Sequence, residues 1–188
     1  MCCYSEISHS FAVRYGLFSC LEVITMSYIK KKSQKQEQNT AKLLKGRAQI
    51  ASGALWGLKG DVRTEDYLIE NKFTDSDYYS LKLSIWNKIE KEAVKDNLRT
   101  PLMQIDIQED RLVVLDLSLF YDLFNEYNLN IVADISTEKK SFRIGKTLAN
   151  RVCQETNGYI NYAKMCFMEN HSKNLAIISL DNFIGINE

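Results

Sequence analysis

The stretch DVRTEDYLIENKFT, residues 61–74, decides the fold class of this chain. Its first three residues and residues 67–74 have the β-branched, aromatic and alternating character of two short strands, joined by a polar turn at residues 64–66. In the longer strand Glu70 and Lys72 share one face, because successive side chains alternate between the two faces of a strand. The sequence therefore predicts a strand pair that presents a carboxylate beside an ammonium group.

Apolar periodicity predicts further elements on both sides of this strand pair. On the N-terminal side the spacing of Glu37, Ala41 and Leu44 predicts a helix that ends at Gly46. On the C-terminal side it predicts a helix over 80–97, a hairpin of strands 102–107 and 112–117 turned at 108–111, and an amphipathic segment over 118–127. Helices that alternate with paired strands in this way indicate an α/β domain.

The C-terminal part of the chain resembles the segment before it. Residues 80–83 are similar to residues 141–144, and residues 112–120 are similar to residues 175–183. Convergent apolar patterning is an alternative explanation for such a match. The second copy has no counterpart of the charged set at residues 61–72, so we expect it to have a structural, partner-binding or substrate-clamping role.

Length and composition narrow the class of protein. The 188 residues carry 24 Lys plus Arg, 24 Asp plus Glu and 45% hydrophobic residues, which is typical of a globular protein. A chain of this length buries roughly 70% of its unfolded surface and needs no disulfide or metal scaffold. No apolar run approaches the ~20 residues of a membrane span, so no membrane association is expected. Five cysteines without a CxxC spacing favour reduced thiols in the cytoplasm, which is the host cytoplasm if the protein is phage-encoded.

Composition also divides the chain into three parts. Residues 1–25 differ from the rest and are expected to form an N-terminal extension that is poorly ordered. Residues 26–128 hold the predicted helices and strands described above. Residues 129–188 are expected to form a C-terminal extension of the same compact unit.

One block of this neutral chain is strongly basic. Between residues 27 and 60, eight lysines and arginines accompany a single acid, Glu37. Such a cluster is typical of phosphate contacts, and it includes Lys35, Lys42, Arg47 and Lys59. Apolar residues follow Glu37 at the spacing of one helix face, namely Ala41, Leu44 and Ala48. Glu37 is therefore predicted to point towards the protein, where a carboxylate needs a partner or a metal ion.

The charged residues predict a reaction class. Asp61 and Glu70, near the ends of paired strands, offer the hard oxygen ligands that Mg²⁺ or Mn²⁺ prefers. Lys72 could hold an attacking water and stabilise negative charge, while a metal ion would activate that water and bind a phosphoryl oxygen. These parts suit hydrolysis of a phosphodiester, with the basic helix contacting the nucleic-acid backbone.

Several blocks in the same order carry a family resemblance. They are Gln36-Glu37, Gly46-Arg47, Ser52-Gly53-Ala54, Lys59-Gly60-Asp61-Val62, Ile69-Glu70-Asn71-Lys72, Tyr79-Ser80-Leu81 and Trp86-Asn87-Lys88-Ile89, with Pro101 after them. This pattern resembles the PD-(D/E)XK nuclease superfamily, in particular its phage and archaeal Holliday-junction-resolvase-like branch. Gly60 stands where the motif has proline, and Asn71 stands where cysteine or valine is commoner.

The resemblance implies a fold and a role for each matching residue. The fold would be a restriction-endonuclease-like core, a mixed β-sheet flanked by helices, followed by the C-terminal α+β extension. Asp61, Glu70, Glu37 and the backbone carbonyl of Asn71 would bind Mg²⁺, and Lys72 would position or activate the water. Ser52 would contact a phosphate near the scissile bond.

The resemblance also implies an activity, which is Mg²⁺-dependent endonucleolytic cleavage of DNA, with branched DNA as the expected substrate. A homodimer is expected because two strands of a junction are cut symmetrically. Two alternatives remain open at this stage. One is a nuclease for linear DNA, either a repair exonuclease or a restriction-type enzyme; the other is a catalytically silent DNA- or protein-binding module. Clustered acids argue against a pure DNA binder, since they repel phosphate unless a cation lies between them.

Overall fold

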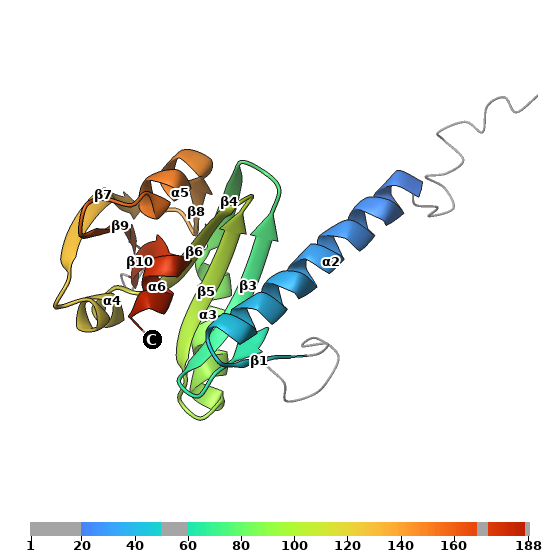
Figure 1. Ribbon diagram of the computed structural model, residues 1–188, viewed down its shortest axis with the longest axis horizontal. Helices are drawn as coiled ribbons and strands as arrows, with labels where there is room; N and C mark the ends of the chain where they lie inside the picture. The colour runs from blue at the N-terminus through green and yellow to red at the C-terminus, as the bar shows by residue number, and fades with distance from the viewer. Residues whose placement is uncertain (1–19, 50–59, 169–172, 187–188) are drawn as a thin grey trace, which may run out of the picture.

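The computed structural model describes residues 20–49, 60–168 and 173–186, and only the backbone of residues 20–27 and 29. Helices and strands alternate along these segments (Figure 1). In chain order they are α2 (Cys20–Leu43), β1 (Arg47–Ala48), β2 (Val62–Arg63), β3 (Tyr67–Thr74), β4 (Tyr78–Lys82), α3 (Leu83–Lys95), β5 (Thr100–Ile107), β6 (Asp110–Asp116), α4 (Leu117–Leu123), β7 (Asn128–Thr137), β8 (Ser141–Gly145), α5 (Lys146–Cys153), β9 (Tyr159–Phe167), β10 (Lys173–Ser179) and α6 (Leu180–Gly185).

Eight of the strands form one mixed sheet in the order β1-β2-β3-β5-β6-β10-β9-β7. The pairs β3–β5 and β7–β9 are parallel, and the other neighbours are antiparallel. β4 and β8 form a separate antiparallel ribbon. The expected α/β class and mixed sheet flanked by helices are therefore observed.

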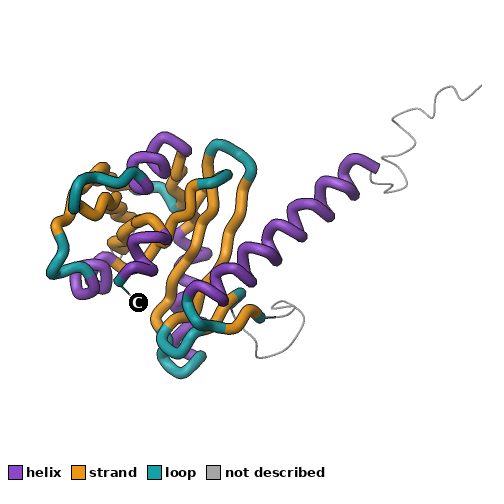
Figure 2. The backbone as a smooth tube through the Cα atoms, viewed as in Figure 1, coloured by secondary structure: helices purple, strands orange, loops and turns teal. Residues whose placement is uncertain are grey.

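Helices cover both faces of the sheet, as the tube view shows (Figure 2). Buried side chains of α3, α5 and the β4–β8 ribbon pack with alternate sheet residues such as Met103 and Ile105 on one face. Buried side chains of α2, α4 and α6 pack with the intervening residues such as Ile69 and Leu102 on the other face. The N-terminal part of α2 extends beyond the sheet (Figure 1). Because successive side chains of a strand point to opposite faces, the sheet has an apolar core on each face and the fold has three layers.

The two halves of the described sheet repeat one arrangement. The order β3–β4–α3–β5–β6–α4 is followed by the same order of elements, β7–β8–α5–β9–β10–α6. The halves meet at the antiparallel pair β6–β10, where Val114 lies opposite Ile177, and at the ribbon, where Leu81 lies opposite Phe142. Each of these facing residues has its sequence counterpart as its partner, at offsets of 63 and 61 residues. The similar segments thus lie on an approximate two-fold axis.

Several predicted boundaries differ from the observed ones. The helix expected from residue 80 begins at Leu83, because residues 78–82 pair with β8. The hairpin turn expected at 108–111 is shorter, since β6 begins at Asp110. The N-terminal helix ends at Leu43, so Ala48 belongs to β1 and not to the helix face expected to hold it.

The end of α2 has a physical explanation. The N–H of Gly46 donates to the carbonyl of Ala41 at 2.7 Å, and Lys45 adopts a left-handed conformation with φ 53°. This is the hydrogen-bonding pattern of a helix C-terminus. A Cβ on Gly46 would lie 2.5 Å from the carbonyl oxygen of Arg63, so a glycine is needed where the chain passes β2.

Within the described part of the chain, no helix combines the length and the apolar character that spanning a membrane requires.

Candidate active site

The candidate site lies at the edge of the sheet, where β3 extends beyond the end of its pairing with β2. In the described residues β2 pairs only with Leu68 and Ile69 of β3. Asp61 precedes β2, and its N–H donates to the carbonyl of Ile69 at 2.9 Å. Its Oδ2 accepts a hydrogen bond from the N–H of Asn71 at 2.8 Å. Asp61 therefore holds the edge of β3 next to Glu70.

Gly60 sets the approach of Asp61 to this edge. Gly60 has a left-handed φ of 70°, which favours glycine over residues with a Cβ. A Cβ at this position would lie 2.6 Å from Cδ1 of Leu68. Glycine at position 60 is thus required by both backbone conformation and close packing.

Glu70 and Lys72 project from β3 on the face that α3 covers, beside Met103 and Ile105 in the register of β5. The Nζ of Lys72 lies 2.6 Å from Oε1 of Glu70. Burial alone would lower the pKa of Lys72, but its hydrogen bond with Glu70 and the Glu70 charge raise it. The side chain is therefore held as an ammonium group.

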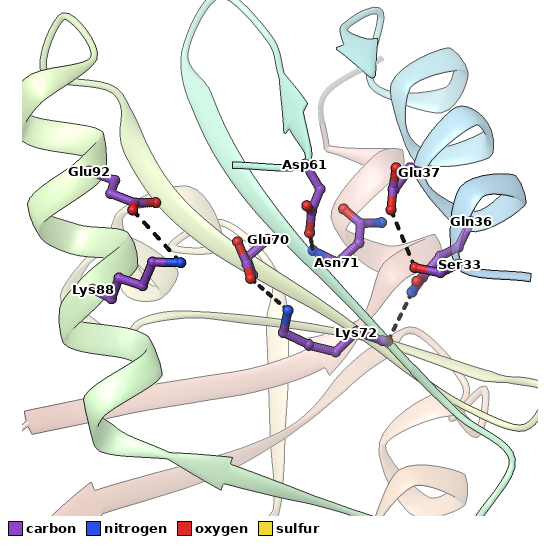
Figure 3. A network of polar contacts seen from close by, with 9 residues as sticks. All are labelled: Ser33, Gln36, Glu37, Asp61, Glu70, Asn71, Lys72, Lys88 and Glu92. Carbon is purple, nitrogen blue, oxygen red and sulfur yellow. Dashed lines mark hydrogen bonds and ion pairs between the residues drawn. The ribbon is translucent and has the colours of Figure 1, made fainter. Parts of the chain in front are cut away.

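Glu37 reaches the same edge from α2, on the opposite face of the sheet (Figure 3). Its Oε1 accepts a hydrogen bond from Oγ of Ser33 at 3.3 Å. Burial and the charge of Asp61 raise the pKa of Glu37, the hydrogen bond from Ser33 and the charge of Lys72 oppose them, and the charge of Glu70 adds a smaller increase. Three carboxylates and one ammonium group thus act on one another around the edge of β3.

A buried polar network fixes α2 against β3 beneath Glu37. Nε2 of Gln36 donates to the carbonyl of Lys72 at 3.0 Å, and Nδ2 of Asn71 donates to Oγ1 of Thr40 at 2.9 Å. Oγ1 of Thr40 lies 2.6 Å from Oε1 of Gln104 on β5. All except Lys72 are almost completely buried. Because buried polar groups are stabilised by such mutual hydrogen bonds, the network determines where Glu37 enters the site.

The sequence assigned no role to several of these residues. Ser33 precedes Glu37 by four positions and Thr40 follows Gln36 by four, so helical spacing could have grouped them with the acid. No local signal links Gln104 to this helix. Tyr79 is another addition, because burial and the Glu70 charge raise its pKa while Lys72 lowers it. Its phenol therefore belongs to the environment of the Glu70–Lys72 pair.

The predicted DNA contacts are placed differently from the acids. Lys35 and Lys42 lie on α2 and Arg47 lies on β1, and all three side chains are exposed. Lys35 and Lys42 are seven positions apart and share a helix face that differs from the buried face of Gln36 and Thr40. The remaining two predicted contacts, Ser52 and Lys59, lie outside the described residues.

The donor set suits a hard divalent cation in its chemistry. Burial is the main cause of the raised pKa of Glu37, and the charges of Asp61 and Glu70 add a repulsion that a cation would relieve. The carbonyl of Asn71 points to the same side of β3 as its N–H, which is bonded to Asp61. In the described conformation each carboxylate accepts a hydrogen bond from the protein, and no three acidic, imidazole or thiol groups of the described residues converge on one point. Metal binding would therefore require the carboxylates to move closer together.

Other residues with reactive side chains give no comparable arrangement among the described residues. Burial raises the pKa of the Cys153 thiol to about 12, and the charges of Asp110 and Asp181 contribute. A thiolate at this position would be scarce at neutral pH. Trp86 is completely buried in the core. The two histidines, His9 and His171, lie outside the described residues.

No protein-family model matches the chain, and no curated protein matches it either. Its chemistry is therefore inferred from the residues of the site.

Proposed function

We propose that this chain is a metal-dependent endonuclease that hydrolyses DNA phosphodiester bonds and acts on branched DNA such as a four-way junction. One observation supports the proposal above the others. Glu37 on α2 joins Asp61, Glu70 and Lys72 of the β2–β3 hairpin, and the charges of these four residues act on one another at a single edge of β3. Acids gathered beside a lysine at a sheet edge suit metal-assisted hydrolysis of a phosphodiester.

Each residue has a proposed role. Glu37, Asp61, Glu70 and the Asn71 carbonyl would hold Mg²⁺, with Mn²⁺ as a substitute. When bound, the ion would supply a Lewis acid and a bound water of lowered pKa. Because the pKa of Lys72 is raised, its ammonium group would stabilise the negative charge of the phosphate and orient water, and it would not serve as the proton acceptor.

Substrate contacts and assembly are part of the same proposal. Lys35, Lys42 and Arg47 would contact phosphates of the DNA backbone, as would Ser52 and Lys59. A junction is resolved by paired cuts in two strands, so we propose a homodimer that brings two equivalent sites to one substrate. The fold does not define the DNA structure that is bound, and the substrate must be tested directly.

The decisive experiment is cleavage of labelled four-way junction and linear duplex DNA with Mg²⁺ and with EDTA. We expect metal-dependent cleavage of the junction, and a loss of about 100-fold or more in the Glu70→Gln variant. Asp134→Asn is the matched control, since Asp134 is a half-exposed acid of another strand, paired with Lys164. Equal cleavage of linear duplex would overturn the preference for branched DNA. DNA binding without cleavage in Mg²⁺ or Mn²⁺ would overturn the assignment as an enzyme.

Metal binding can be tested without the reaction. A ligand present at about ten times its Kd stabilises the folded state by about 1.4 kcal/mol, which raises the melting temperature of a chain of this size by about 3–5 °C. We expect this shift for the wild-type protein in Mg²⁺, and a much smaller one for Asp61→Asn and Glu70→Gln. Asp134→Asn should retain the full shift. The same shift in all four proteins would place the bound ion elsewhere.

A further inference from the structure

The outer face of α3 carries a line of lysines that the proposed site does not use. Lys88, Lys91 and Lys95 follow Ser84 at +4, +7 and +11, so these side chains share one helix face. All of them are exposed, and the side chain of Lys88 retains 63% of its accessible surface. The buried residues of α3, such as Trp86 and Ile89, lie on the other side of the helix.

This face forms a shallow, open groove between exposed side chains of one helix. Its lining residues all belong to α3, and they are Ser84, Asn87, Lys88, Lys91, Glu92 and Lys95. Three of them are cationic and one is anionic, while the chain as a whole has no net charge. The anionic one, Glu92, is largely covered, with 12% of its side chain exposed and its carboxylate 3.8 Å from Nζ of Lys88. The solvent-facing charge of the groove is therefore positive.

The groove lies next to the candidate site. Glu70 and Lys72 project from β3 towards the face of the sheet that α3 covers. Figure 3 shows Lys88 and Glu92 on the side of α3 that is turned towards Glu70. Lysines on an ordinary amphipathic helix also face solvent, but here the cationic face and the proposed reacting groups lie on the same side of one sheet. A polyanion bound along α3 would thus extend towards Glu70.

We propose that Lys88, Lys91 and Lys95 bind the phosphate backbone of the DNA and guide it towards the Glu70–Lys72 pair. The inference rests on the proposed nuclease function, which it extends with a second contact surface, separate from α2. Its basis is charge complementarity, because lysines recognise a phosphate backbone as point charges and need no defined base sequence. Ser84 and Asn87 offer additional hydrogen-bond donors along the same groove.

Binding measured without cleavage tests this surface. Anisotropy of labelled duplex and four-way-junction DNA is recorded in EDTA from 50 to 200 mM salt, with the full-length chain. The variant is Lys88→Gln/Lys91→Gln/Lys95→Gln. Lys139→Gln/Lys146→Gln/Lys164→Gln, in the second half of the sheet, is the control with the same change in charge. Circular dichroism verifies that both variants fold.

The inference predicts a smaller dependence on salt for the α3 variant. The slope of log K against log salt should fall by about 2.7 on duplex DNA, since each lost phosphate contact contributes about 0.9. The ratio of wild-type to variant affinity should then decrease about 40-fold between 50 and 200 mM salt. If the wild-type protein binds DNA and the α3 variant shows the same slope, the inference about α3 is overturned but the proposed function is not. An equal loss of slope in the control variant would also overturn it. Absence of DNA binding by the wild-type protein both in EDTA and with Ca²⁺ in place of EDTA would overturn the proposed function as well, because the clustered acids repel phosphate when no cation lies between them.

Discussion

At the scale of single residues, the candidate site works against the stability of the fold. Glu37 is placed near Asp61 and Glu70, and burial together with these charges raises its pKa. Because the pKa of Glu37 is raised in the folded state, folding favours the protonated carboxyl group. The free energy of unfolding is therefore higher at low pH, and this stabilisation is lost as the pH rises through the folded pKa. The ionised Glu37 at neutral pH is thus unfavourable for folding, as is common for functional residues.

This argument predicts opposite effects of one substitution on stability and activity. Glu37→Gln removes the charge but keeps the shape, so the melting temperature at pH 7.5 should rise by about 1–2 °C, a small value because solvent screens the site. The same variant should lose about 100-fold or more of its DNA cleavage, since one metal ligand is lost. The stability difference should shrink as the pH is lowered towards 4. A lower melting temperature at pH 7.5, compared with wild type and with Asp134→Asn, would contradict this account.

At the scale of elements, one lysine connects three parts of the fold. Nζ of Lys173 on β10 lies 2.5 Å from Oε1 of Glu90 on α3 and 2.7 Å from Oδ2 of Asp116 at the end of β6. Oδ1 of Asp116 also accepts a hydrogen bond from the N–H of Ser118 at 2.9 Å, which caps α4. Burial alone would raise the pKa of Asp116, but the hydrogen bonds from Lys173 and Ser118 lower it below its ordinary value.

The lowered pKa predicts a stability effect that depends on pH. A carboxylate with a depressed folded pKa stabilises the protein above its unfolded pKa and loses this effect as the pH falls through the folded value. Asp116→Asn keeps a good N-cap residue but removes the charge. It should destabilise the protein by up to about 1 kcal/mol at pH 7, with a difference that shrinks below about pH 4. Urea unfolding at pH 7 and pH 3 measures this, with Asp122→Asn of the same helix as control. A difference equal at both pH values would exclude the ion pair as its cause.

The elements also show what local sequence can predict. β3 was predicted with its observed bounds, 67–74, because alternation within one strand is a local property. β4 was predicted as the start of a helix, since its pairing partner β8 lies about 60 residues further along the chain. The acids of the site were recognised by residue type and spacing. The network that fixes Glu37 was not, because Gln104 contacts Thr40 across 64 positions and no local pattern connects them.

At the scale of the whole molecule, the two-fold arrangement shows that the two halves differ at the candidate site. Val114 and Ile177 face each other on the approximate axis, so β-sheet register relates the two halves residue by residue. Val114 pairs with Met103, which lies beside Glu70, whereas Ile177 pairs with Ala163, which lies beside Ala133.

The same register places Ile135 where the first half has Lys72. An alanine and an isoleucine can neither bind a metal ion nor stabilise a phosphate charge. Among the described residues, the second half thus has the fold of the first without its charged pair, and it would serve to complete the sheet.

One site per chain predicts how cleavage depends on the number of active chains. Glu70→Gln alone should lose about 100-fold or more of the cleavage activity, because Ala133 and Ile135 cannot replace the lost site. In an equal mixture of wild-type and Glu70→Gln chains that exchange partners freely, the total number of strand cuts should fall to about one half. Paired cuts across a junction should fall to about one quarter, since both chains of the dimer must be active. Gel analysis of nicked and resolved junctions measures both products. Half of the wild-type nicking in Glu70→Gln alone would reveal a second site in the chain. If paired cuts fall only to one half, as the total number of strand cuts does, then one active chain makes both cuts of a junction.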